Sequence, residues 1–595
     1  MPSYKAPLRD MQFILFDVLK VQDAGNAVAA YAEMTPDVVT AILEEAGRFC
    51  ENVLQPINRG GDEEGCTFDT GTVRTPTGFK DAYTKFVEGG WPGIACDPEH
   101  GGQGVPNTVN FAFEEMICSA NLSFGLFPGL THGAYNALQA HGSDDLKRTY
   151  LPKMVGGSWS GTMCLTEPQC GTDLGLIRTR AEPVNDGSYR LHGTKIFISA
   201  GEHDLTENIV HLVLARLPDA PSGVRGISLF VCPKFLPQPD GSLGARNSVA
   251  CGALEKKMGI KASPTCVMNF DGATAWLVGV PNKGLAAMFT MMNTARLMVG
   301  IQGLGVAEAA YQGALSYARN RLQMRAPTGP KYPEQPADPI IVHPDIRRLL
   351  MRMKAMTEGC RAMAMWIGHE LDIATGHPDA ERRQAADDLV ALMTPVVKSM
   401  LTDHGFSAAN EGVQIHGGHG YIREWGMEQL VRDARITQIY EGTNGIQALD
   451  LVGRKLPTGT GRLARRFFHP VGSYLEQMAT VPAMAEIVAP LAKAFGRLQQ
   501  ATLWLGKAGI ANPDDAGAAA TDYLRMFGLV AIGYMWCRMA ETALAAGEDK
   551  TDSFYSAKLE CARFYMAKMI PETGSLLASI TAGSKSVMAL SEDAF

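Results

Sequence analysis

The pattern of apolar and polar residues predicts helices in the first third of the chain. From Thr35 the sequence reads Thr-Pro-Asp-Val-Val, in which a capping threonine precedes a proline at the first helical position. Apolar residues then recur at spacings of three and four as far as Leu54, which is the period of an amphipathic helix. Similar patterns continue to about Leu151, so we expect this region to be predominantly α-helical.

The spacing of apolar residues changes near Gly161 and predicts a β-domain that extends to about Asn282. At roughly 120 residues, this region has the ordinary size of a domain. Glycine and proline separate four short apolar runs, a pattern typical of strands joined by turns: 189–198, 211–215, 227–231 and 265–270.

Helical patterns resume at about Lys283 and continue to Arg454, broken by a proline-rich stretch at 327–339 that we interpret as a surface loop. Residues 457–461 look like a linker, and a helical pattern rich in Ala, Leu and Met follows. The apolar run 526–537 is shorter than the roughly 20 residues of a membrane span. We therefore expect a buried helix there and no membrane span.

These patterns predict an α+β fold made of an N-terminal extension and four modules. In chain order they are the extension (1–34), an N-terminal α-domain (35–160), a middle β-domain (161–282), a C-terminal helical domain (283–455) and an extra C-terminal α-helical domain (463–595).

Composition narrows the class of protein. Hydrophobic residues make up 46% of the 595 and charged residues 19%, which excludes a disordered or fibrous chain. The net charge of −8 provides no general attraction for nucleic acid. Twelve scattered cysteines without a CxxC pair, and no signal-peptide pattern at Met1, indicate reduced thiols in the cytoplasm.

Two candidate segments lie in the predicted β-domain. Residues 163–173 form a polar, glycine-containing loop whose hydroxyls and backbone N–H groups could hold a heterocycle or a phosphate; an ordinary capped turn is the alternative. In the strand 195–199, Phe197 could lie against a flat ring, although an aromatic residue in a strand more often belongs to the core.

Two further segments lie in the second helical region. Residues 414–420 contain three glycines, which permit close approach to a phosphate, together with His416 and His419. No Asp, Glu or Cys completes a metal-ligand set there, so we predict no metal. Glu441 follows two apolar residues and precedes Gly442, a context that suits a partly buried general base at a helix end; a capping or surface glutamate is the alternative.

In their order and spacing these segments resemble the acyl-CoA dehydrogenase family, over about residues 35–453. Residues 166–168 match its Thr-Glu-Pro flavin loop, 414–418 its Gln-x-x-Gly-Gly motif, and 440–443 its Tyr-Glu-Gly-Thr catalytic segment. Residues 254–263 are similar to its Lys-Met/Leu-Gly segment.

The resemblance implies a helical domain, a β-barrel or sandwich and a four-helix bundle, with FAD between the last two. Arg321 and the 414–418 motif would reach the pyrophosphate and adenosine of a neighbouring subunit's FAD. Carried over by position, the implied cofactor contacts are Met163, Leu165, Thr166, Gly171, Thr172, Phe197, Ile198, Ser199, Arg321, Gln414, Ile415, Gly417, Gly418, Thr443 and Asn444. The implied substrate contacts are Thr172, Asn293, Arg296, Tyr440 and Gly442.

The resemblance also implies the reaction, α,β-dehydrogenation of an acyl-CoA to the trans-2-enoyl-CoA, as in fatty-acid β-oxidation. Glu441 would remove the α-proton while the β-hydrogen leaves as hydride to flavin N5. A ribityl hydroxyl and the backbone N–H of Glu441 would stabilise the charge that grows on the thioester oxygen.

Two positions depart from the family pattern. Asn293 stands where an aspartate is usual, which removes a charge near pantetheine, and Met324 stands where phenylalanine is common. The N-terminal segment and the added C-terminal module resemble the long bacterial branch, which includes fatty acyl-CoA and 3-methylmercaptopropionyl-CoA dehydrogenases. That branch implies a homodimer and an electron-transferring flavoprotein as acceptor. The alternatives are an acyl-CoA oxidase and a flavin-bearing DNA-protection protein of the same fold.

Overall fold

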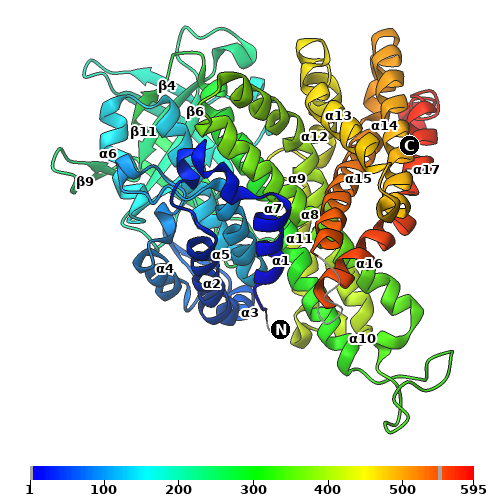
Figure 1. The fold of residues 1–595 in the computed structure, drawn as a ribbon. Helices are drawn as coiled ribbons and strands as arrows, with labels where there is room; N and C mark the ends of the chain where they lie inside the picture. The colour runs from blue at the N-terminus through cyan, green and yellow to red at the C-terminus, as the bar shows by residue number, and fades with distance from the viewer. Residues whose placement is uncertain (1–3, 547–552) are drawn as a thin grey trace. The chain divides into compact units, whose positions relative to one another are not determined.

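The computed structural model describes residues 4–546 and 553–595, and its fold is drawn in Figure 1. The chain divides into two compact units. The β unit comprises Arg48–Val105 and Ala120–Met298, and the helical unit comprises the described residues of Met1–Gly47, Pro106–Ser119 and Val299–Phe595.

The first predicted helix is confirmed. Helix α2 covers Pro36–Phe49, and the Thr35 hydroxyl accepts a hydrogen bond from the backbone N–H of Val38 at 3.4 Å. The proline therefore occupies the first helical position, where its missing N–H costs nothing.

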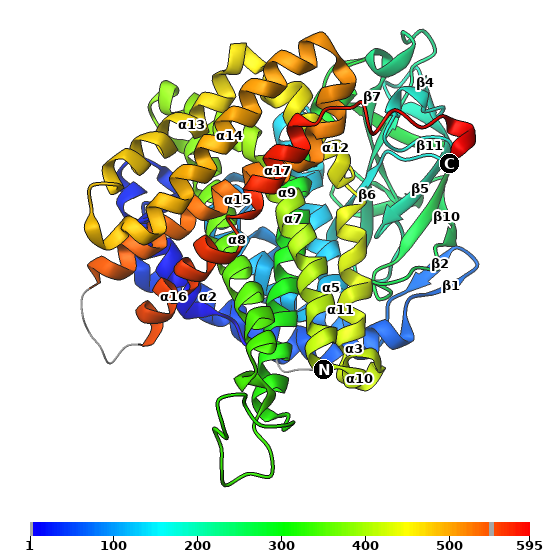
Figure 2. The ribbon, with the colours of Figure 1, turned by 90° about the vertical axis from the view of Figure 1, so that its right-hand side faces the viewer.

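The middle region forms the predicted strands. The main sheet has seven strands in the order β3-β6-β7-β11-β5-β4, with β10 paired to β11, and only β3 and β6 run parallel. Figure 2 labels all of these strands except β3. The four predicted runs lie in β5, β6, β7 and β11, which confirms them. The strands are β1 (Thr67–Asp69), β2 (Thr72–Arg74), β3 (Trp159–Cys164), β4 (Arg180–Pro183), β5 (Tyr189–Ser199), β6 (Asn208–Ala215), β7 (Ser228–Pro233), β8 (Phe235–Pro237), β9 (Leu243–Arg246), β10 (Val249–Leu254) and β11 (Thr265–Val278).

Strand β6 shows where the core of the β unit lies, because all of its residues are buried. Val210, Leu212 and Leu214 pack in one hydrophobic cluster with residues of α5 and α6, and Val213 and Ala215 pack in a second cluster among the strands. Alternate residues of a strand point to opposite faces, so β6 is covered on both sides. The α-helices of this unit are α3 (Gln55–Glu64), α4 (Phe79–Glu88), α6 (Asp144–Val155), the part of α5 (Asn107–His141) that follows a non-helical residue at Asn121, and the first part of α7 (Gly284–Asn320), up to Met298.

The helical unit contains the predicted C-terminal helices. The proline-rich stretch lies between α7 and α8, as expected. A Cβ atom on Gly405 would lie 2.4 Å from the carbonyl oxygen of Gly303, so α7 and α9 approach each other closely at a pair of glycines. The principal helices of the helical unit are α7 (Gly284–Asn320, from Val299 onward), α8 (Pro344–Gly376), α9 (Ala380–His416), α10 (Gly418–Tyr421), α11 (Met427–Arg435) and α12 (Asn444–Asp450).

The extra C-terminal module is helical, as predicted. Helices α14 and α17 pack on α15, which contains the buried apolar run 526–537 (Figure 2). The expected linker is only a short turn, because Gly459, Thr460 and Gly461 adopt left-handed conformations within the span of α13. The module consists of α13 (Thr458–Met478), α14 (Ala485–Ala511), α15 (Pro513–Ala545), α16 (Ser553–Lys568) and α17 (Glu572–Thr581).

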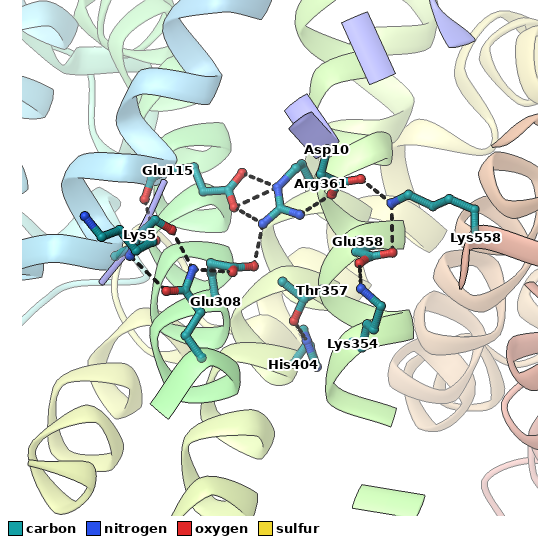
Figure 3. A network of polar contacts seen from close by, with 12 residues as sticks. Lys5, Asp10, Glu115, Glu308, Lys354, Thr357, Glu358, Arg361, His404 and Lys558 are labelled. Atoms are coloured by element: carbon teal, nitrogen blue, oxygen red, sulfur yellow. Dashed lines mark hydrogen bonds and ion pairs between the residues drawn. The ribbon is translucent and has the colours of Figure 1, made fainter. Parts of the chain in front are cut away.

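A buried network of charged side chains joins α16 to the N-terminal segment, and Figure 3 shows it. Arg361 of α8 is 1% exposed and binds Asp10 of α1 (Leu8–Gln12), Glu115 of α5 and Glu308 of α7. Lys558 of α16 is 2% exposed and binds Asp10 and, at 2.8 Å, Glu358. The two ends of the chain therefore share one set of ion pairs.

Among the described residues, α7 is long and apolar enough to cross a membrane by length and composition, but 56% of its apolar stretch is buried, as in a core helix. The bent pair Thr458–Met478 and Pro482–Ala511 passes the same test only when it is counted as one span.

Candidate functional site

In the β unit, the predicted flavin loop is fastened to strand β5. The backbone N–H of Ile196 donates to the carbonyl oxygen of Thr166 at 2.9 Å. The Lys195 ammonium donates to the carbonyl oxygen of Leu165 at 2.9 Å and to Glu167 at 2.8 Å. Lys195 is 0% exposed and Glu167 is 3% exposed, so this ion pair is fully buried.

Glu167 is ionised in the folded protein. Burial alone would raise the pKa of this carboxyl, but the Lys195 ammonium and hydrogen bonds from Thr179 and the backbone of Arg178 lower it to about 2. The loop that carries Thr166 is therefore held by a fixed negative charge.

The Lys195→Met variant is expected to unfold more easily and to retain less FAD, because it leaves the Glu167 carboxylate buried without its cation. Removing one partner of a buried ion pair costs about 3–5 kcal/mol, whereas removing both is much less harmful. Urea unfolding followed by flavin fluorescence measures both effects. The double variant Lys195→Met/Glu167→Gln should recover part of the loss, and wild-type stability in the single variant would contradict the prediction.

The same ion pair predicts an acid dependence of stability. The pKa of Glu167 lies below its ordinary value of 4.5, so its contribution is complete above about pH 4.5 and is lost as the pH falls toward 2. Lys195→Met should show a smaller loss of stability over that interval, in unfolding curves collected at successive pH values.

The other predicted cofactor residues of the β unit differ in accessibility. Phe197 is 59% exposed and has a φ of 60°, so its ring is available to a ligand. Ile198 is buried in the cluster among the strands, and only its backbone could meet a cofactor. Met163, Thr166 and Ser199 are half-buried, Leu165 is buried, and Gly171 and Thr172 are exposed.

The two predicted substrate residues of α7 also differ. Asn293 is exposed, whereas Arg296 is buried and its guanidinium lies 5.9 Å from the centre of the Phe289 ring. Asn293 therefore leaves an uncharged amide at the surface where an aspartate is usual in the family.

In the helical unit, Glu441 lies in a tight turn between a 3₁₀ turn (Ile436–Gln438) and α12. Its φ is 56° and that of Gly442 is 84°, so two successive residues are left-handed. For a residue with a Cβ atom this conformation costs roughly 1–2 kcal/mol, which contacts with the surrounding protein must offset. The Thr443 hydroxyl then caps α12 by accepting from the N–H of Ile446 at 3.3 Å.

Helix α9 holds both sides of this turn. The Asn444 amide accepts from Lys398 at 2.7 Å and donates to Asp403 at 2.7 Å. Gln438 also donates to Asp403, at 2.7 Å. The side chains of Thr443 and Asn444, predicted as cofactor contacts, are thus engaged in fixing the turn.

Tyr440 anchors the turn to α7, because its hydroxyl donates to Oε1 of Gln302. Burial raises the pKa of Tyr440, so the phenol stays neutral beside Glu441. Residues 440–444 thus form one turn in the helical unit, held by α7 and α9.

A cavity of about 610 Å³ in the helical unit is lined by Arg321 and by the histidines of the 414–420 motif. The rings of His419 and Trp425 stack with centres 4.7 Å apart, and those of Tyr317 and His416 with centres 4.2 Å apart. Both histidines therefore line an aromatic pocket.

The residues of this cavity fit the adenosine diphosphate end of a cofactor. Arg321 supplies a cation for phosphate, and the stacked rings supply flat surfaces for a base. A Cβ atom on Gly417 or Gly418 would meet nothing within 4 Å, so the backbone there is open to close approach. Gln414 is exposed at the same helix end, whereas the side chain of Ile415 is buried.

Several residues at these places were not predicted. The sequence singled out strand 195–199 because of Phe197 as a possible ring contact. It did not predict that Lys195 of the same strand forms a buried ion pair with Glu167. Tyr317 and Trp425 of the cavity lie outside the predicted motifs. The available signal was Trp425, an aromatic residue that follows the glycine-rich motif 414–420 closely in the sequence. On α13, Arg462 and Arg466 both pair with the buried Asp388, which neutralises part of their charge.

Family models match almost the whole chain. The descriptions and ranges are "Acyl-CoA dehydrogenase, N-terminal domain" at 37–158, "Acyl-CoA dehydrogenase, middle domain" at 162–273, "Acyl-CoA dehydrogenase, C-terminal domain" at 282–456 and "Acetyl-CoA dehydrogenase C-terminal like" at 467–591.

Individual relatives agree with these models. The chain is 45% identical to a 3-methylmercaptopropionyl-CoA dehydrogenase of Ruegeria pomeroyi, over 99% of this chain and 100% of that protein. It is 33% identical to a broad-specificity linear acyl-CoA dehydrogenase of Mycobacterium tuberculosis, over 100% of both chains. A Bacillus anthracis acyl-CoA dehydrogenase solved with FAD shares the fold, with a TM-score of 0.72 at 21% identity over 92% of each chain. The chain therefore belongs to the acyl-CoA dehydrogenase family, whose members are FAD-dependent oxidoreductases acting on CH–CH bonds.

Proposed function

We propose that this protein desaturates an acyl-CoA between Cα and Cβ and that Glu441 removes the α-proton. The observation that carries the proposal is the left-handed turn at Glu441, held on both sides by α9, at the position of the family's catalytic segment. Backbone strain of this kind is retained where a side chain must point in one direction.

The chain's own residues divide the work. The Glu441 carboxylate accepts the α-proton, while its backbone N–H donates to the thioester oxygen as charge develops there. Met163 to Thr172, together with Phe197 and Ser199, would hold the flavin end of FAD, and Arg321 with the cavity at His416 and His419 would hold an adenosine end. When bound, FAD supplies the hydride acceptor for the β-hydrogen.

We propose 3-methylthiopropionyl-CoA as the preferred substrate, supported by the full-length similarity to the Ruegeria pomeroyi enzyme. Linear acyl-CoAs, in a β-oxidation role, are the second candidate, supported by the Mycobacterium tuberculosis relative. Asn293 and Arg296 are the proposed contacts to the pantetheine part.

Anaerobic flavin bleaching with 3-methylthiopropionyl-, butyryl-, octanoyl- and palmitoyl-CoA tests the substrate proposal. One methylene in an apolar pocket changes kcat/KM by about 10–200-fold, so a fitted acyl group should stand out. We expect the highest kcat/KM with 3-methylthiopropionyl-CoA. Faster bleaching by octanoyl- or palmitoyl-CoA would favour the second candidate.

The physiological setting is also proposed. Family membership supports an electron-transferring flavoprotein as acceptor. Twelve cysteines outside any disulfide support a cytoplasmic location, and the resemblance to the long bacterial branch supports a homodimer. Peroxide release during turnover in air would indicate an oxidase instead. Salt-sensitive binding to duplex DNA without acyl-CoA turnover would support the DNA-protection alternative.

A further inference from the structure

The side chain of Gln447 contacts the backbone of the turn at Glu441. It is 0% exposed, and its amide nitrogen lies 3.2 Å from the carbonyl oxygen of Glu441 and 3.2 Å from that of Gly442. One side chain thus donates to two successive carbonyl groups of the left-handed turn.

Side chains of α9 hold Gln438 before the turn and Asn444 after it. The peptide units between these anchors contain the two left-handed residues, whose conformation costs free energy that contacts with the surrounding protein must offset. Gln447 provides hydrogen bonds at that point.

The fit between Gln447 and the turn is close. A Cβ atom on Gly442 would lie 2.7 Å from Nε2 of Gln447, so the carboxamide occupies the space that any side chain at 442 would need. The Oε1 atom of Gln447 is buried and has no hydrogen-bond partner among the described residues. The donated bonds to the turn are therefore the polar contacts that this side chain makes.

We propose that Gln447 is a positioning residue for Glu441, which rests on the base role proposed above. By fixing the carbonyl groups of residues 441 and 442, the carboxamide sets the direction of the Glu441 carboxylate and of the neighbouring backbone N–H. A general base and an oxyanion donor both depend on such alignment, and small misplacements reduce rates strongly.

The test uses two variants of nearly the same shape that cannot donate these bonds. Gln447→Met replaces the amide with a thioether, and Gln447→Glu places a carboxylate against two carbonyl oxygens when ionised. Both should bleach bound flavin with saturating acyl-CoA roughly 10²-fold more slowly than the wild type, with KM changed less than about threefold. Rates are expressed per bound FAD, so that loss of folded protein does not enter them.

Gln429→Met is the matched control. Gln429 of α11 is also buried, at 2% exposure, and donates to Asp433 of the same helix at 3.2 Å. It should lose stability but keep its bleaching rate. A purely structural Gln447 would behave in the same way, and wild-type rates per flavin in both Gln447 variants would overturn the proposal.

Glu441→Gln, measured alongside, separates the two hypotheses. If Glu441→Gln stops bleaching while the Gln447 variants do not, the positioning role fails and the base role stands. If Glu441→Gln bleaches normally, the base role itself fails.

Discussion

The Glu441→Gln variant is expected to bind FAD and acyl-CoA as the wild type does, yet to bleach its flavin about 10²- to 10⁴-fold more slowly, the usual contribution of a general base. An amide has nearly the same shape as the carboxylate but cannot take the α-proton. Because the backbone of the turn is held by α9 and Gln447, the substitution should leave the oxyanion donor in place.

Stopped-flow reduction under anaerobic conditions measures the rate, and titration with the enoyl-CoA product measures binding. Glu476→Gln, an exposed position on α13, makes the same chemical change far along the chain and should not alter either quantity. Bleaching within about threefold of the wild type in Glu441→Gln would remove Glu441 from its proposed role.

The helices and strands were predictable because the spacing of apolar residues that indicates them is a property of short segments. The cap at Thr35 and the strand at 189–198 are properties of short segments, and the structure has both. The motif residues at 440–443 were predictable because they adjoin one another. The residues that hold this motif in place were not predictable, because contacts between residues far apart in the chain leave no periodic pattern in a single sequence.

The supports of the site illustrate this limit. Asn444 donates a hydrogen bond to Asp403, which lies 41 residues away in the sequence, and Lys195 pairs with Glu167, which lies 28 residues away. A lysine in an alternating strand is ordinarily assigned to the solvent face. Only the fold places it against a buried carboxylate. Residues 457–461 show the converse, because glycines that suggested a linker form a compact left-handed turn.

The Arg361→Met variant is expected to be destabilised by about 3–5 kcal/mol or more, since it leaves carboxylates buried without their main cation. Arg361 donates to Glu115 at 2.9 and 3.0 Å and to Glu308 at 2.6 Å, and it also binds Asp10. Burial outweighs the guanidinium and raises the pKa of Glu115 to about 7 even in the wild type. Methionine fills much of the same space but pairs with none of these groups.

Chemical unfolding of the holoenzyme measures the loss, and Arg563→Met is the matched control. Arg563 of α16 is 41% exposed and pairs with Glu486 and Glu560 at the surface, where such contacts are worth about 0–1 kcal/mol. Lys558→Met should resemble Arg361→Met, because burial favours loss of charge at Asp10 while Lys558 and Arg361 hold its pKa at about 2. If Arg361→Met and Arg563→Met unfold alike, the buried network does not fasten α1 and α16 to α7 and α8.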